Sequence, residues 1–206
     1  MTELIGIAAV AVVAWFAAGT IWNIRIGRGV MGWMQDGLPL IGARTTVRWL
    51  GSSAAEMVIR DGKDPFASAT LVIFLEPRDV PWMWALGRSR GRRDTLIIRG
   101  TLRAAPRVEF EALDPASWSG RDAFARVPPE WPSHEGKDVV VHGADAALVQ
   151  AKALLEIAGQ AGMRVMRLSV RRTEPNFQLH VSLPDHKGPA RAFFEAVHAL
   201  AQRALA

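Results

Sequence analysis

The chain of 206 residues contains no cysteine. Disulfide bonds, thiolate metal sites and cysteine nucleophiles are therefore excluded, and the absence suits a protein of a reducing compartment. Tyrosine is also missing. Lysine occurs only four times, so arginine supplies nearly all the positive charge, and the formal net charge is +5. An arginine excess can mark contact with phosphate or anionic lipid, and it can equally reflect the base composition of a genome.

The motifs of common enzyme and cofactor sites are missing as well. No G-x-x-x-x-G-K-[ST], H-E-x-x-H or G-x-S-x-G pattern occurs, and the five histidines are scattered along the chain. Gly27, Gly29 and Gly32 spell G-x-G-x-x-G, but the dinucleotide fingerprint requires a strand before it, and here a long apolar run precedes it. The sequence therefore predicts no cofactor, no metal and no catalytic residue, and it favours a protein that is not an enzyme.

A single apolar run dominates the N-terminal end. Leu4 to Trp22 is 19 residues long and carries no charge, which matches the roughly 20 apolar residues that a membrane span needs. The three residues before it include no lysine or arginine, whereas a signal peptide begins with a basic segment. Arg25 and Arg28 follow the run, and cationic residues mark the cytoplasmic side of a span. We therefore expect residues 1–22 to form an uncleaved, single-pass anchor in the cell membrane, with the N-terminus outside and the C-terminal domain in the cytoplasm.

Residues 23–44 are predicted to form a juxtamembrane linker. Several glycines interrupt its apolar residues. Because each interior glycine costs a helix about 1 kcal/mol relative to alanine, we do not expect a regular helix here. Trp33, together with Arg25 and Arg28, suits the layer of lipid headgroups.

Residues 45–113 have the pattern of an antiparallel β subdomain. Strands are expected at residues 45–50, 54–60, 69–76, 94–103 and 107–113. Ala69 to Glu76 is a continuous apolar run, which is typical of a strand covered on both faces, while Asp94 to Arg103 alternates between apolar and polar residues. Because only Ala104, Ala105 and Pro106 separate the last two strands, we expect them to form a hairpin.

The segment from Asp79 to Asp94 combines apolar residues with a run of arginines. Its main members are Trp82, Met83, Trp84, Arg88, Arg90, Arg92 and Arg93. One interpretation is a hairpin connection whose tryptophans fold back onto the core. In a second, the tryptophans lie among lipid headgroups and the arginines contact anionic lipid, each contributing on the order of 1 kcal/mol. A third is a patch for a protein partner, because Trp, Met and Arg are enriched at the centres of interfaces.

The C-terminal part of the chain has the clearest pattern. Residues 114–136 contain four prolines and are predicted to form a long connection with a short helix near residues 120–126. Residues 137–206 then show strand, helix, strand, strand and helix. Ala144 to Gln160 follows the 3.6-residue repeat, residues 163–172 and 177–183 form a hairpin, and Pro189 opens the last helix. This order predicts a split, ferredoxin-like βαββα subdomain.

The hairpin strands carry a second candidate site. Apolar and polar residues alternate along both strands, so one face of this part of the sheet is polar and cationic. Its residues include Arg167, Arg171 and His180. The simpler interpretation is the solvated face of an antiparallel sheet, and the sharper one is a site for an anionic ligand.

The sequence as a whole predicts an α+β protein with one N-terminal transmembrane helix and a mostly antiparallel sheet domain. We expect a membrane-anchored accessory, scaffold or assembly protein that contacts lipid headgroups or a membrane protein partner through residues 82–93. An anion-binding domain or an enzyme using the basic sheet face is the alternative. For a tethered domain lipid is the nearest anion, so a nucleic-acid partner is not expected. The sequence does not set the oligomeric state.

Overall fold

The computed structural model describes all residues from Met1 to Ala206. It contains five α-helices and one nine-stranded sheet, which confirms the predicted α+β class. The helices are α1 (Thr2–Gln35), α2 (Pro81–Ser89), α3 (Trp118–Phe124), α4 (Asp145–Gln160) and α5 (Ala190–Leu205). The strands are β1 (Thr45–Trp49), β2 (Ala54–Ile59), β3 (Phe66–Phe74), β4 (Thr95–Leu102), β5 (Phe110–Leu113), β6 (Ser133–Glu135), β7 (Val140–Gly143), β8 (Val165–Val170) and β9 (Phe177–Ser182).

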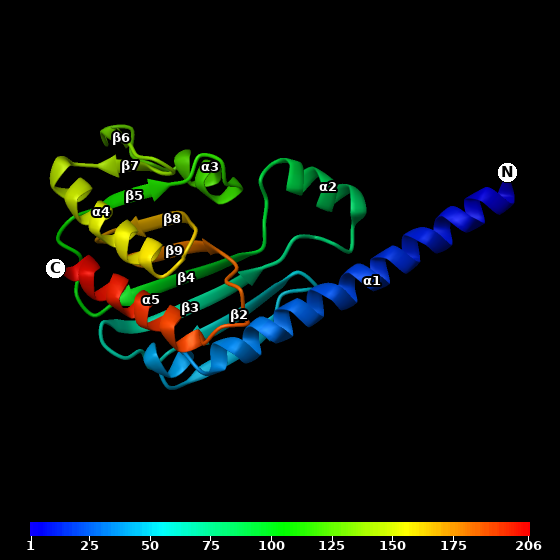
Figure 1. Cartoon of the computed structure of the whole chain (residues 1–206), viewed down its shortest axis with the longest axis horizontal. Helices are drawn as coiled ribbons and strands as arrows, with labels where there is room; N and C mark the ends of the chain where they lie inside the picture. Colours follow the sequence, from blue (N-terminus) through cyan, green and yellow to red (C-terminus); the bar gives the residue numbers. More distant parts are fainter.

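Neighbouring strands are antiparallel throughout the sheet, whose order is β1-β2-β3-β4-β9-β8-β5-β7-β6 (Figure 1). The predicted hairpin β8–β9 is confirmed, and the strands expected at residues 45–50 and 54–60 form β1 and β2, which pair with each other. The predicted hairpin between residues 94–103 and 107–113 is wrong, because β4 pairs with β9 whereas β5 lies between β8 and β7. Asn176, just before β9, adds a contact to the β4–β9 pairing, since its side-chain oxygen accepts the Leu102 N–H at 2.7 Å.

The C-terminal segment has the predicted order of strand, helix, strand, strand and helix. Both β7 and β8 run antiparallel to β5, which separates them, so α4 connects two parallel strands across a third. That third strand comes from an earlier part of the chain, and β9 pairs with β8 and β4. The ferredoxin-like assignment is therefore not confirmed.

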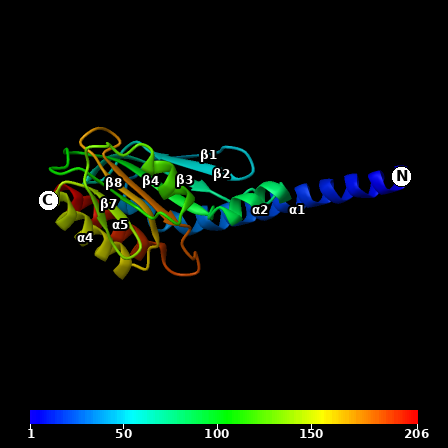
Figure 2. The same cartoon turned by 90° about the horizontal axis from the view of Figure 1, so that it is seen from above.

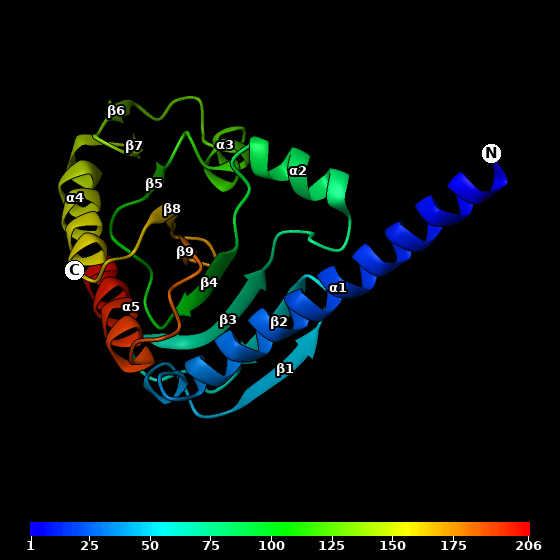
Figure 3. The ribbon, with the colours of Figure 1, turned by 45° about the vertical axis from the view of Figure 1, so that its right-hand side comes forward.

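The apolar core lies on one face of the sheet, under α4, α5 and the second half of α1 (Figure 3). Alternate residues of the central strands supply it, among them Leu71, Leu96 and Leu179, each at most 1% exposed. The core cluster contains residues from both predicted subdomains, 45–113 and 137–206. The connection at residues 114–136 therefore does not separate two cores.

The predicted linker at residues 23–44 is largely helical. α1 continues without a break to Gln35, so the expectation that no regular helix forms here is wrong. Its buried residues are Gly19, Asn23, Gly27, Val30 and Met34, a spacing that places them on one helical face. A Cβ on Gly27 would lie 2.4 Å from the Trp49 ring, so the glycine permits a close contact between α1 and β1. Packing of this face on the sheet offsets the low helix propensity of glycine.

The first half of α1 leaves the domain. Every residue from Met1 to Ala18 is exposed, and Figures 1 and 2 show this half projecting beyond the sheet. α1 is long and apolar enough to cross a membrane, by its length and composition. At a rise of 1.5 Å per residue, Thr2 to Ala18 spans about 26 Å and Thr2 to Trp22 about 31 Å. Because a hydrocarbon core is about 30 Å thick, burial of α1 against the domain begins, at Gly19, near the place where a span of that length would end.

Candidate membrane and partner interface

The arginine-rich segment between β3 and β4 forms a helix. α2 begins at Pro81, whose fixed φ suits the first helical position, and it ends at Ser89. None of its residues is buried. Of its two tryptophans, Trp84 turns toward the domain and Trp82 is exposed. α2 lies beside the point at which α1 leaves the domain, and its N-terminal end points the same way as the projecting half of α1 (Figures 1 and 3).

α2 has two different faces. Trp84 and Arg88, one turn apart, both turn inward to the carboxylate of Glu76. The other face carries Trp82, Met83 and Leu86, which are 64%, 50% and 52% exposed. The residues predicted from the sequence thus divide into a pair that holds the helix in place and an exposed apolar set, to which Leu86 is an addition.

Glu76 is the anchor point of this arrangement and is only 2% exposed. Its carboxylate accepts the Trp84 indole N–H at 2.5 Å and a guanidinium N–H of Arg88 at 3.2 Å. Burial of a carboxylate is costly unless it is paired and hydrogen-bonded, and here it is both. Sequence reasoning assigned Glu76 only to the end of an apolar strand. The signal that could have revealed it is a carboxylate that continues an uninterrupted apolar run.

The same cluster ties α2 to α1. Asn23 of α1 is completely buried and donates its side-chain N–H to the carbonyl of Glu76 at 3.1 Å. Arg78 forms two hydrogen bonds to Asp94, at 3.0 and 2.7 Å, and a third to the side-chain oxygen of Asn23. The Trp15 indole N–H donates to the Arg78 carbonyl at 2.9 Å. These bonds set the position of α2 relative to the helix that leaves the domain.

The remaining arginines of the segment differ in how free they are. Arg93 donates to the carbonyls of Arg88 and Arg92, and the guanidinium of Arg92 lies 5.9 Å from the ring centre of Trp118 on α3. Arg90 is exposed, and its side chain has no hydrogen bond or ion pair. Because Arg88 is paired with Glu76, Arg90 is the member of the set most open to an external anion.

The predicted contact residues of α1 lie in two different environments. Arg25 and Arg28 are exposed, with no hydrogen bond or ion pair from either side chain. Trp33 instead packs into the domain: its indole N–H donates to the Gly188 carbonyl at 2.7 Å, and its ring lies 5.5 Å from that of Phe193. Trp33 is three helical turns beyond Trp22, about 16 Å along the axis. It contributes to the interface between α1 and α5.

The polar sheet face is built around a buried carboxylate. Glu111 on β5 is 1% exposed and accepts hydrogen bonds from Arg167 at 2.9 Å, Arg171 at 3.0 Å and Ser169 at 2.8 Å. The predicted pair Arg167 and Arg171 does come together, but on this internal anion. Helix α3 covers this part of the face, with Gly120 and Ala123 as its buried residues. The cluster therefore offers less positive charge to a ligand than the sequence suggests.

His180, the third predicted residue of this site, lies apart from that carboxylate. Its Nδ1 is 2.6 Å from the hydroxyl of Ser119 on α3, and its Nε2 is buried without a hydrogen-bond partner. Burial, followed by the positive charges of Arg167, Arg99 and Arg126, lowers the pKa of His180 to about 3. The imidazole is therefore neutral at physiological pH and adds no charge for anion binding.

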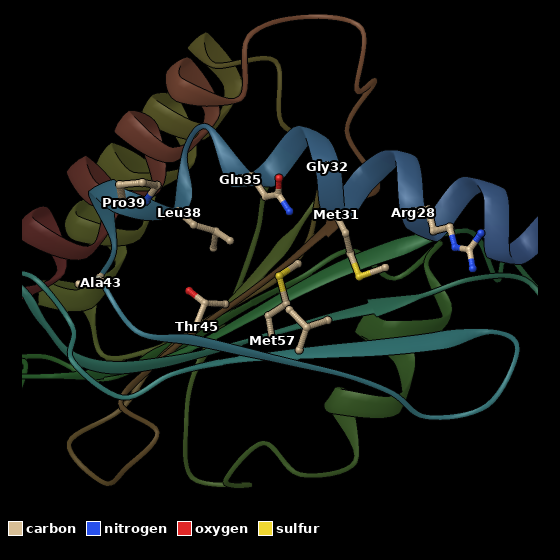
Figure 4. Close-up of a pocket in the computed structure, with 11 residues that line it drawn as sticks. Arg28, Met31, Gly32, Gln35, Leu38, Pro39, Ala43, Thr45 and Met57 are labelled. Atoms are coloured by element: carbon tan, nitrogen blue, oxygen red, sulfur yellow. The ribbon is translucent and has the colours of Figure 1, made fainter.

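A groove of about 580 Å³ lies between α1 and the sheet edge formed by β1 and β2. Figure 4 shows Met31 of α1 and Met57 of β2 pointing into it, with Gln35 and Thr45 nearby. Arg28 is its one charged lining residue. The groove thus has the character of an apolar crevice and holds no group of side chains suited to acid–base chemistry.

Comparison with known proteins does not add a family. No protein-family model matches the chain, and a search of curated proteins found no match.

Proposed function

We propose that this protein is a single-pass, membrane-anchored accessory or scaffold protein whose domain is held against the bilayer by α2. The observation that carries the proposal is the position of α2 beside the exit of the apolar half of α1, together with the exposure of its apolar residues Trp82, Met83 and Leu86. We place the N-terminus outside and the domain in the cytoplasm of the cell, because the first arginines follow the span.

The dimensions of the helices support this arrangement. Trp15 and Gly19 already contact the domain, through the carbonyl of Arg78 and the backbone around it. Only about 21 Å of α1 precedes Trp15, which is less than a hydrocarbon core of about 30 Å. The apolar end of α2 from Pro81 to Leu86 would then enter the same leaflet, and an interfacial helix buries its apolar side by about 5–10 Å. The two lengths together approach the thickness of one bilayer core.

The positions of the cationic residues of α2 are consistent with insertion of its apolar end to this depth in the bilayer. Trp84, Arg88 and Arg90 follow Trp82 and Met83 along α2, so that the cations lie on the side of the sheet domain. At the level of the headgroups each exposed cation gains on the order of 1 kcal/mol from anionic lipid. A membrane protein partner would meet the same surface, since Trp and Arg dominate the energetics of many interfaces.

The absence of cysteine makes a direct depth measurement straightforward. A fluorescent label on a single cysteine, Met83→Cys, should be strongly quenched by lipids that carry a spin label in the acyl chain, when the full chain is in vesicles. The matched control is Val149→Cys on α4, which is 70% exposed and lies away from α2. Equal, weak quenching at both positions would refute docking of α2. Reactivity of the Val149→Cys variant toward an impermeant maleimide, in vesicles of known sidedness, tests the proposed orientation.

A further inference from the structure

A second groove runs along α1 at the level of the expected membrane boundary. It has a volume of about 590 Å³, and its lining residues are Ala18, Ile21, Trp22, Arg25, Ile26 and His186. Five of the six come from α1, and His186 comes from the connection between β9 and α5, which passes beside α1 (Figures 1 and 3). The imidazole of His186 lies close to Gly29, since a Cβ built on that glycine would be 3.3 Å from Nε2.

The chemistry of this groove changes along its length. Ala18, Ile21 and Trp22 make its N-terminal end apolar, whereas Arg25 and His186 make its other end polar. The Arg25 side chain has no partner within the chain, and neither has that of Arg28 one turn further on. Lys187 adds a cation beside His186, and the carboxylate in that connection, Asp185, accepts the Lys187 backbone N–H at 3.3 Å. The polar end therefore keeps an excess of positive charge.

The level of the groove matches the boundary between hydrocarbon and headgroups. If α1 enters the opposite face of the bilayer at Thr2, Trp22 lies about 31 Å further along, at the end of a core about 30 Å thick. Arg25 lies about 4.5 Å beyond Trp22, among the phosphates. An acyl chain would pass Ala18 and Ile21, and its phosphate would reach the guanidinium of Arg25, a group whose fork of donors fits phosphate oxygens.

We propose that this groove binds one anionic phospholipid of the leaflet that faces the domain. The unpaired charge of Arg25 favours a lipid with a net negative headgroup, such as phosphatidylglycerol, over a zwitterionic one. This inference rests on the proposed function, because it requires α1 to cross the bilayer. It adds a lipid class and a defined site. This site lies on the flank of α1 next to the connection between β9 and α5, whereas α2 belongs to the connection between β3 and β4.

Native mass spectrometry of the detergent-extracted full chain can test the site. The chain is given equal amounts of phosphatidylglycerol and phosphatidylcholine with identical acyl chains, and the ratio of the retained lipids is measured. We expect a severalfold preference for phosphatidylglycerol, reduced about fivefold by Arg25→Gln, as the loss of one basic contact implies. Arg25→Lys should keep part of the preference. The matched control is Arg107→Gln, an exposed residue between β4 and β5 at the end of the sheet away from α2.

Each outcome decides between distinct conclusions. An unchanged lipid ratio in Arg25→Gln, or no preference in the unaltered chain, overturns the lipid site. Loss of the preference on addition of inorganic phosphate identifies a free-anion site and also overturns it. In all three cases quenching at position 83 would still uphold membrane docking. Release of the unaltered chain from membranes by alkaline carbonate would instead remove the proposed function and this inference together.

Discussion

The two halves of α1 form one continuous helix but lie in opposite environments. Both are rich in apolar residues and contain glycine, yet Met1 to Ala18 is exposed on every side, while from Gly19 onward a buried residue recurs every three or four positions. A helix with one apolar stripe buries that stripe by packing on a domain, whereas a helix that is apolar on every side needs lipid or other helices around it. The periodicity of burial thus distinguishes the half of α1 that packs on the domain from the half that projects away from it.

Glycine shows the same contrast. A Cβ on Gly19 would lie 2.3 Å from the carbonyl oxygen of Arg78, and one on Gly27 would overlap the Trp49 ring, whereas nothing lies within 4 Å of Gly6. Gly19 and Gly27 in the second half of α1 therefore allow the helix to approach the backbone and a ring of the domain. In the first half it has no such contact.

The largest expected effect is on membrane insertion, from substitutions in the exposed half of α1. Val10 and Val13 are 70% and 68% exposed. An arginine near the centre of a span costs about 2.5–3.5 kcal/mol on insertion scales, so the double variant Val10→Arg, Val13→Arg should no longer resist extraction by carbonate. Thermal unfolding of the domain should not change, because neither residue is part of its core. Val10→Leu is the control, and a double variant that remains integral to the membrane would contradict a span at this position.

A second prediction compares two glycines of the same helix. Gly19→Ala forces the new methyl group against backbone atoms of Arg78 and Asp79, which cannot swing away as a side chain can. Overpacking of this kind costs about 1–3 kcal/mol. The free energy of unfolding of the full chain in detergent should fall by that amount. Gly6→Ala should cause no loss, and equal behaviour of the two variants would mean that α1 does not pack on the domain at Gly19.

Local patterns account for what the sequence predicted well. Helices α4 and α5 and the β8–β9 hairpin have strong periodicity, and each was confirmed within a few residues. The partner of β4 was missed because strand pairing joins residues far apart in the chain, and a short link such as Ala104 to Pro106 does not decide it. The continuation of α1 to Gln35 was missed because helix propensity treats glycine only as destabilising. It does not include the tertiary contact with the Trp49 ring that Gly27 makes possible.

For the candidate sites, the sequence identified the residues but not the contacts that they make in the structure. The composition of the segment from Trp82 to Arg93 identified it as unusual, but only the structure separates the exposed Trp82 from Trp84, which is bonded to Glu76. The basic character of Arg167 and Arg171 was visible in the alternation of residues 163–172. Their neutralisation by Glu111 depends on the register between β5 and β8, which no local pattern reveals.

The smallest expected effect lies at the boundary between the halves of α1. Trp15 belongs to the exposed half, but its indole N–H reaches back to the Arg78 carbonyl at 2.9 Å. Trp15→Phe keeps most of the ring and removes this donor, so it should lower the free energy of unfolding by about 0.5–1.5 kcal/mol, or roughly 2–4 °C in Tm per kcal/mol for a chain of this size. Trp22→Phe is the matched control, because the Trp22 side chain is 62% exposed and makes no hydrogen bond. A drop of equal size in both variants would show that the loss comes from the ring and not from the hydrogen bond, in which case the contact of α1 with the domain would begin at Gly19.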